Sequence, residues 1–172
     1  ESWNGSAWTE VGDLNTGRYD TAAGGPYTSA IVAGGSDAGS PGYQSVTETW
    51  NGSSWTETGD LNTARQAIAG DGTTTAMIVA GGTTGSNVAV SETFNGSTWT
   101  EVNDLNTGRN AMAKNGAGTY TDTLVFGGLE PAYSAKTEKW NGTIWFEQSD
   151  LSNSRQALAG AGASSTAALA SF

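Results

Sequence analysis

The chain has 172 residues, of which only 14% are charged, and its formal net charge is −10 at pH 7. It contains no cysteine and no histidine, which excludes disulfides, thiolate nucleophiles and the usual zinc, copper and haem ligand sets. The seven basic residues are scattered singly, and no apolar run approaches the roughly 20 residues that span a bilayer. We therefore expect neither nucleic-acid binding nor membrane insertion.

The composition favours a single all-β domain over residues 1–172. Glycine, threonine, serine, alanine and asparagine are abundant, and the long stretches of leucine, lysine and glutamate that form helices are missing. A chain of this length ordinarily makes one domain.

A repeat with several sets of landmarks runs through the chain. An aromatic residue followed by Asn-Gly-Ser/Thr precedes a tryptophan five residues later, and this pattern starts at Trp3, Trp50, Phe94 and Trp140. These aromatic residues are separated by 47, 44 and 46 residues, and four arginines repeat at the same spacings. Such periods are typical of propeller blades and solenoid turns. The other repeated positions are Trp8, Trp55, Trp99 and Trp145; Arg18, Arg65, Arg109 and Arg155; and Glu1, Glu48, Glu92 and Glu138.

In chain order, the repeat predicts an outer hairpin, three four-stranded units and an inner hairpin. The outer hairpin covers residues 1–12 and the inner hairpin residues 156–172, while the four-stranded units cover residues 18–58, 65–102 and 109–148.

The unit over residues 65–102 has the clearest strand pattern. We expect strands at 66–69 and 75–80, then at 91–94 and 98–102, with a first turn at 70–72 and a second at Asn-Gly. Asn-Gly favours a type I′ turn, in which both central residues have positive φ. Four antiparallel strands per period are typical of a propeller blade.

The order of these motifs resembles the kelch repeat: a strand ending in Gly-Gly, then Glu-x-aromatic, tryptophan about five residues later, Asp-Leu and arginine. The resemblance extends over residues 1–172 and implies a β-propeller. The sequence WNGSxWTE followed by DLNTxR also resembles repeats in predicted proteins of marine phages and bacteria. The Gly-Gly pairs are Gly34 and Gly35, Gly81 and Gly82, and Gly127 and Gly128.

The two terminal hairpins supply complementary halves of a fourth blade. Aligning Arg155 with Arg65 places Ser171 and Phe172 where the second unit has its Gly-Gly pair. We therefore expect four kelch-like blades, closed by pairing of the N-terminal outer strands with the C-terminal inner strands, which removes free strand edges. The alternatives are a fragment of a larger propeller and a dimer with eight blades. Small residues in the innermost strands favour the narrow four-bladed form.

The repeated residues favour structural roles. We expect the aromatic pairs to pack in the core, with sugar stacking as the alternative, and each repeated glutamate to form an ion pair with a repeated arginine. The Asn-Gly-Ser/Thr sequences favour turns over glycosylation. Four aspartates between the units are weak candidates for a calcium site, with turn capping as the alternative; they are Asp13, Asp60, Asp104 and Asp150.

The loops between the second and third strands differ most among the repeats and predict a binding face. They cover residues 36–46, 83–90 and 129–136. We expect these loops to share a face with the connections between units, because recognition residues often lie on loops of a rigid scaffold. Tyr43 and Tyr133 are the best candidates for contact with a sugar or a protein, and Asp37 and Glu130 are further candidates.

These features predict a non-enzymatic propeller without a cofactor that acts as a binding or structural module. We expect it in a virion, as a phage fibre or decoration protein, or in cell-surface adhesion, and therefore extracellular or on the virion surface. The alternatives are an intracellular kelch adaptor and a propeller subunit whose role is self-assembly. The kelch-like copper oxidases need histidine ligands, and no pair of carboxylates stands out as glycosidase machinery.

Overall fold

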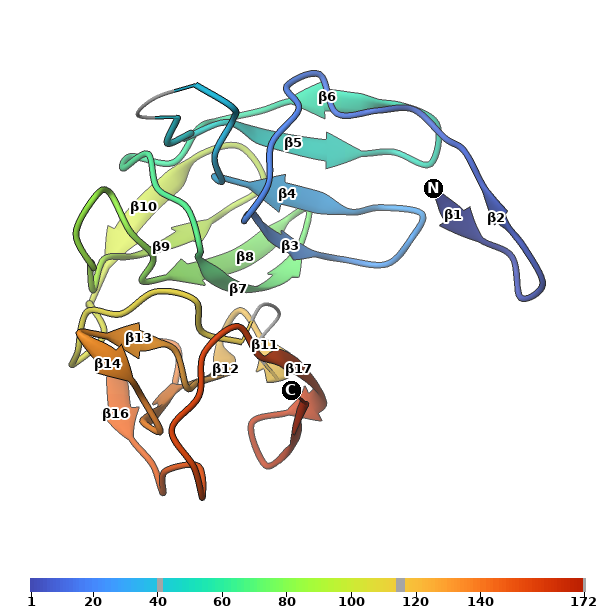
Figure 1. Cartoon of the computed structure of the whole chain (residues 1–172). Coiled ribbons are helices and arrows are strands. Elements are labelled where there is room, and N and C mark those ends of the chain that lie inside the picture. Colours follow the sequence, from blue (N-terminus) through green and yellow to red (C-terminus); the bar gives the residue numbers. More distant parts are fainter. Residues whose placement is uncertain (40–41, 114–116, 172) are drawn as a thin grey trace.

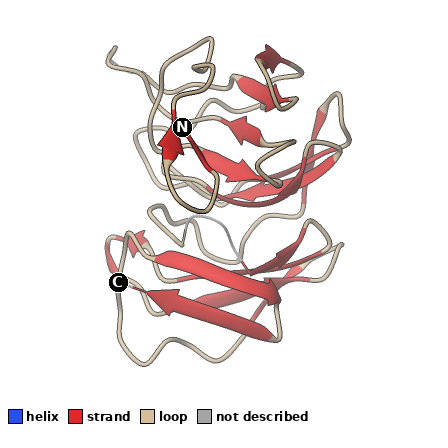
Figure 2. Ribbon diagram, turned by 90° about the vertical axis from the view of Figure 1, so that its right-hand side faces the viewer, coloured by secondary structure: helices blue, strands red, loops and turns tan. Residues whose placement is uncertain are grey.

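Strands are the only regular secondary structure in the computed structural model of the chain, which describes residues 1–39, 42–113 and 117–171 (Figures 1 and 2). Most strands belong to three four-stranded antiparallel sheets, one in each predicted four-stranded unit. The predicted all-β class is confirmed. Sheet I contains β3 (Ala22–Gly24), β4 (Ile31–Ala33), β5 (Thr47–Trp50) and β6 (Trp55–Glu57); sheet II contains β7 (Ala69–Thr73), β8 (Ala76–Ala80), β9 (Ser91–Phe94) and β10 (Trp99–Val102); sheet III contains β11 (Ala117–Thr119), β12 (Asp122–Phe126), β15 (Thr137–Trp140) and β16 (Trp145–Glu147).

Three hairpins complete the described strands, and each is a two-stranded sheet of its own. They are β1 (Ser2–Trp3) with β2 (Trp8–Thr9), β13 (Leu129–Glu130) with β14 (Ala132–Tyr133), and β17 (Ala159–Ser164) with β18 (Ala167–Ser171). Both views place the N-terminal hairpin apart from the C-terminal one (Figures 1 and 2).

The prediction that the two terminal hairpins form one closing sheet within the chain is therefore wrong for this structure. The segment after β2 is held on sheet I, because the Trp55 indole donates to the Gly12 carbonyl at 3.1 Å and the Asn15 N–H donates to Glu48 at 2.8 Å. The Asn15 contact is the same one that Asn62 and Asn106 make in the other connections. The Trp55 bond differs from its equivalents, since the Trp99 and Trp145 indoles donate to side-chain hydroxyls instead.

The C-terminal hairpin also differs in register from the expected alignment. Its ladder shifts between Gly162 and Ser164, and Ser171 lies opposite Ala159. In sheet II, Ala69 is the equivalent of Ala159, and it lies opposite Ala80. Ser171 therefore takes the place of Ala80 rather than that of Gly81. One additional residue in the hairpin produces this shift. Phe172 lies outside the described residues.

The first hairpin of sheet II turns later than the sequence pattern predicts. Residues 70–72 lie inside β7, and the chain turns after Thr73. Here glycine permits close packing of neighbouring first strands, because a Cβ on Gly70 would lie 2.8 Å from the Cβ of Ala22.

The Asn-Gly segments form four-residue loops rather than type I′ turns. In sheet I, Trp50 pairs with Trp55 across the loop, and Gly52 has a φ of 96° while Asn51 is outside the positive region. The Asn51 Oδ1 accepts the Ser53 N–H and the Ser53 hydroxyl, both at 2.9 Å. Asparagine and serine thus stabilise the loop through side-chain bonds.

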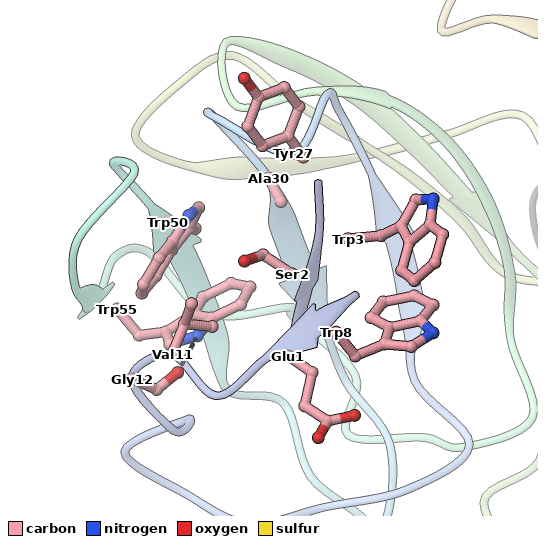
Figure 3. A pocket seen from close by; sticks show the side chains of 10 residues that line it. All are labelled: Glu1, Ser2, Trp3, Trp8, Val11, Gly12, Tyr27, Ala30, Trp50 and Trp55. Carbon is pink, nitrogen blue, oxygen red and sulfur yellow. Dashed lines mark hydrogen bonds between the residues drawn. The ribbon is translucent and has the colours of Figure 1, made fainter. Parts of the chain in front are cut away.

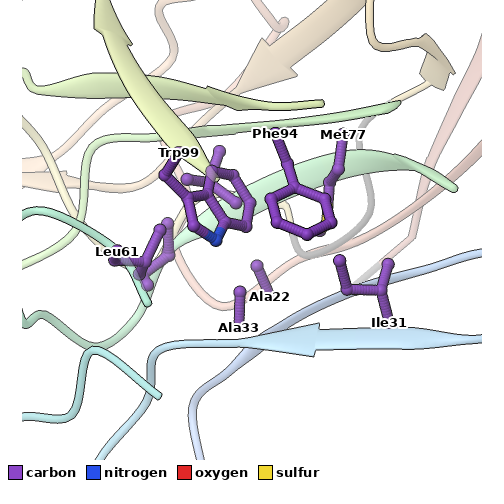
Figure 4. Close-up of a cluster of buried hydrophobic side chains, with 9 residues drawn as sticks. Ala22, Ile31, Ala33, Leu61, Met77, Phe94 and Trp99 are labelled. Carbon is purple, nitrogen blue, oxygen red and sulfur yellow. The ribbon is translucent and has the colours of Figure 1, made fainter. Parts of the chain in front are cut away.

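The hydrophobic core lies between successive sheets (Figure 4). Second strands supply aliphatic side chains, and third and fourth strands supply aromatic rings. Fully burying such a side chain stabilises the fold by roughly 1.5–3 kcal/mol. Between sheets I and II, the cluster contains Ala22, Ile31, Ala33, Leu61, Ile68, Met77, Val79, Phe94 and Trp99.

Buried indole groups also bond across the sheet interfaces. The Trp99 Nε1 of sheet II donates to the Thr47 Oγ1 of sheet I, and the Trp145 Nε1 of sheet III donates to the Ser91 Oγ of sheet II, each at 3.0 Å. Thr47 and Ser91 occupy equivalent positions at the start of β5 and β9. Sheets II and III are therefore each attached to the preceding sheet by the same kind of contact.

A chain of backbone hydrogen bonds links successive repeats along their innermost segments. The Ala67 N–H donates to Asp20, the Ala111 N–H to Ala67, and the Ala157 N–H to Ala111, at 2.9, 3.2 and 2.8 Å. All four residues have a positive φ, between 49° and 56°. Because left-handed alanine costs roughly 1–2 kcal/mol, its recurrence indicates that this linkage is built into every repeat.

Candidate functional site

The repeated glutamates and arginines form buried ion pairs inside the repeats. Arg18 meets Glu48 and Arg65 meets Glu92, each with 2.5 Å between Nη1 and Oε1, and Arg109 pairs with Glu138 in the same way. All six side chains are fully buried. The predicted ion pairs are confirmed at these three sites, and their burial separates them from any ligand.

An asparagine from the preceding connection completes each pair. Asn62 donates both its backbone N–H and its side-chain amide to Glu92 Oε2, at 2.7 Å. Asn15 and Asn106 repeat this contact in the other two sheets. The glutamate therefore fixes the connection and the arginine together.

The protonation equilibria reflect this arrangement. Burial raises the pKa of the Glu48 carboxyl, but hydrogen bonds from Arg18 and Asn15 outweigh it and bring the pKa below its usual value. Burial lowers the pKa of the Arg65 guanidinium, and the Glu92 charge opposes that effect. The ion pairs belong to the scaffold.

Two of the aspartates between repeats cap strands. Asp60 Oδ1 accepts the Thr47 N–H at 3.2 Å, and Asp104 Oδ1 accepts the Ser91 N–H at 3.3 Å. Across the described ranges, acidic side chains do not gather in a group of three or more that could hold a metal ion. The structure thus does not bring Asp13, Asp60, Asp104 and Asp150 together.

The variable loops and the connections between sheets share one face. Backbone N–H groups in the connections donate to loop carbonyls: Leu61 to Ser45, Leu105 to Ala89, and Leu151 to Ala135. The loop after β4, the loop after β8 and the β13–β14 hairpin all lie on the left-hand side of Figure 1. We call this surface the loop face.

Side-chain bonds join neighbouring loops of this face. Asn87 Nδ2 donates to the Leu129 carbonyl at 2.6 Å, and Asn110 Nδ2 donates to Asn87 Oδ1 at 2.6 Å. The Tyr43 hydroxyl of the first loop lies beside Gly85 of the second. The loops are therefore connected to one another.

The predicted binding residues have different surroundings on the loop face. Tyr133 is 60% exposed and lines a cavity of about 360 Å³ together with Ser154 and Gln156. Tyr43 is half-buried at the junction of the first two loops. The two rings thus lie at separate junctions, and Tyr133 is the more accessible.

The two acidic candidates are engaged in contacts within their loops. Asp37 accepts the Gly39 N–H and the Gln44 side-chain amide, both at 2.7 Å. Glu130 lies 2.9 Å from the Lys136 ammonium and accepts the Ser134 hydroxyl at 3.1 Å. Both carboxylates therefore shape the loops that display the tyrosines.

The sequence did not indicate two further cavities. One, of about 390 Å³, lies between the N-terminal hairpin and sheet I and is lined by Trp3, Trp8, Trp50, Trp55 and Tyr27 (Figure 3). The aromatic repeat marks four of these residues, but their accessibility depends on where the hairpin lies. The Trp3–Trp8 and Trp50–Trp55 ring centroids are 5.5 and 5.4 Å apart.

The other cavity, of about 450 Å³, lies among the innermost strands and is lined by small residues of β3 and β17 and by Asp71 of β7. Burial raises the pKa of Asp71 to about 6, and the backbone of Gly72 partly offsets this effect. Because one carboxylate amid glycine and alanine supplies little specificity, the loop face remains the stronger candidate.

The sequence matches no protein-family model and no curated protein sequence. The described part of the chain contains no helix of the length and apolar character needed to cross a membrane.

Proposed function

We propose that the chain is a non-catalytic module of kelch-like propeller blades that recognises a glycan or a protein through its loop face. One observation carries this proposal: segments that differ among the repeats are joined into one face and display Tyr133, which is 60% exposed. The three Arg–Glu pairs of sheets I to III are fully buried and therefore inaccessible to a ligand. Recognition commonly uses variable loops on a regular scaffold.

The propeller interpretation is supported by the contacts between repeats. Each four-stranded sheet packs on the next, and the innermost segments bond through Asp20, Ala67, Ala111 and Ala157 in succession. Blades arranged about a common axis place equivalent loops on one side, as these loops are. We propose an extracellular or virion-surface setting for this module.

Glycan recognition can be tested on an array of immobilised sugars with the fluorescently labelled chain. Tyr133→Ala should lower binding at least tenfold without changing the unfolding midpoint, because the ring is exposed and contributes area to a ligand. A parallel screen against candidate surface proteins with the same variant addresses a protein ligand.

Tyr27→Ala is the matched control. Tyr27 is 81% exposed and lies in the β3–β4 turn, at the opposite end of the strands from the loop face. If Tyr27→Ala and Tyr133→Ala weaken binding equally, or if Tyr133→Ala leaves it intact, the loop face does not carry the recognition.

A further inference from the structure

We propose that β1 of one copy of this chain pairs with β18 of a second copy, so that the two terminal hairpins form a four-stranded sheet between molecules. This inference concerns assembly and does not depend on the loop face. In sheets I to III, the first hairpin pairs with the second through the second and third strands. Among the described strands, β1 pairs with β2 and β18 with β17, and each keeps its other edge open.

The exposure of equivalent residues indicates that these hairpins lack a neighbour. Trp3 and Trp8 are 51% and 64% exposed, whereas Trp140 and Trp145 at the same positions of sheet III are 2% and 4% exposed. In β18, Leu169 is 68% exposed, although the corresponding residue of β8 is buried. Open apolar edges of this kind favour pairing with another chain.

The surface beside β18 has the features that hold a tryptophan at the other interfaces. A cavity of about 170 Å³ lies between sheet III and the C-terminal hairpin, and its lining includes Phe126, Thr137, Leu151 and Ala170. Thr137 starts β15 as Thr47 starts β5 and Ser91 starts β9.

The Thr47 and Ser91 hydroxyls accept hydrogen bonds from the buried indole N–H groups of Trp99 and Trp145, respectively. Trp8 is the next tryptophan of this series, and its indole N–H would therefore donate to Thr137 of the other copy.

The register of the intermolecular ladder follows from sheet II. There, Met77 lies opposite Phe94 and Ile78 opposite Thr93. By the pairing of β17 with β18, Ala168 is equivalent to Met77 and Leu169 is equivalent to Ile78. The proposed ladder thus places Ala168 opposite Trp3, and Leu169 opposite Ser2.

The same sheet would fill the aromatic cavity of Figure 3. The side chain equivalent to Leu169 in sheet II, Ile78, packs toward the following sheet. Leu169 of one copy would therefore cover Trp50 and Trp55 of the other, which line that cavity.

We assign a second copy to the open edge of β18 because the chain's own β1–β2 hairpin does not lie beside that edge. The Trp55 indole bonds to the Gly12 carbonyl of the segment that follows this hairpin, and the hairpin stands apart from β17–β18 in both views (Figures 1 and 2). Two copies related by a two-fold axis can satisfy both edges reciprocally.

Disulfide trapping tests the pairing, because the chain contains no cysteine. The residue pair of sheet II that is equivalent to Ser2 and Leu169 is a non-hydrogen-bonded pair of the antiparallel ladder. The Cα atoms of such a pair are about 4.5 Å apart, a distance that a disulfide spans. Chains carrying Ser2→Cys and Leu169→Cys separately, one with a size tag, are mixed and oxidised. The expected product is a mixed disulfide dimer on a non-reducing gel.

The matched control mixes Ser2→Cys with Ser154→Cys, an exposed position outside the proposed contact. The double variant Ser2→Cys/Leu169→Cys is oxidised at low protein concentration. A yield no greater than the control overturns the proposal, and so does a double variant that closes quantitatively within a monomer.

Light scattering on the unmodified chain gives a second measurement. We expect a dimer whose dissociation constant rises at least tenfold in Trp8→Ala and in Thr137→Val. Tyr120→Ala, which removes a 41% exposed ring elsewhere, should leave it unchanged. A chain that stays monomeric at all concentrations overturns the proposal, and circular dichroism shows whether each variant is folded.

Discussion

Arg65 and Glu92 form an ion pair in which Nη1 and Oε1 are 2.5 Å apart and both side chains are completely buried. The pair joins the segment that enters sheet II to its third strand, and Asn62 adds two hydrogen bonds to the same carboxylate. Since the interaction recurs in all three sheets, it offers a direct test of what holds each repeat together.

Glu92→Gln should destabilise the protein by about 3–5 kcal/mol, because it leaves the Arg65 charge buried without its counterion. Urea unfolding at neutral pH measures the effect. Glu101→Gln is the control, since Glu101 lies opposite Glu92 on β10 and is exposed. A loss below about 1 kcal/mol for Glu92→Gln would show that the pair is dispensable.

The buried indole bond between sheets I and II should show energetic coupling. Trp99→Phe and Thr47→Val each remove one partner of the bond, so their unfolding free energies in a double-mutant cycle should deviate from additivity by about 1 kcal/mol. Thr100→Val, at an exposed position of β10, should be additive with Trp99→Phe. Additivity in both cycles would contradict a stabilising contact between Trp99 and Thr47.

Gly81→Ala should destabilise the fold by about 2–4 kcal/mol, because of its left-handed backbone and its close neighbours. Gly81 has a φ of 65°, and a Cβ would lie 2.5 Å from Met112 Cε and 2.6 Å from the Arg109 carbonyl. Gly17→Ala is the control, as a Cβ there meets nothing within 4 Å. Equal unfolding midpoints for the two variants would refute this explanation.

Asp71→Asn should stabilise the protein at alkaline pH and not at acidic pH. Burial raises the pKa of Asp71 from 3.8 to about 6, so the folded protein holds this proton more tightly than the unfolded chain does. The stabilising effect of protonation is therefore lost as the pH rises from about 4 to about 6.

After allowance for solvent screening, we expect Asp71→Asn to add about 1 kcal/mol at pH 8. Urea titrations at pH 4 and pH 8 measure the difference, with the exposed Asp13→Asn as control. A gain that is equal at both pH values would exclude the ionisation of Asp71 as its cause.

Local sequence determined the strands, the aromatic pairing and the buried ion pairs. Trp50 and Trp55 flank a loop whose length places them opposite each other. The recurrence of Arg65 and Glu92 at equivalent positions of the repeats indicated a contact that is made in sheets I to III. Periodicity carries this information because equivalent residues in a repeat meet equivalent surroundings. The loop turn type was harder to predict, since Asn51 stabilises its loop through the side chain.

Tertiary structure decided where the hairpins and the accessible residues lie. Sequence alone could not show that Asp37 and Glu130 are occupied within their loops, or that Asp71 lies in a β-strand beside a cavity. Sequence alone also could not place the N-terminal hairpin, because the β1 edge is as compatible with β18 of the same chain as with β18 of a second copy. The Trp55 bond to the Gly12 carbonyl links the segment after β2 to sheet I, and it forms only when sheet I is folded.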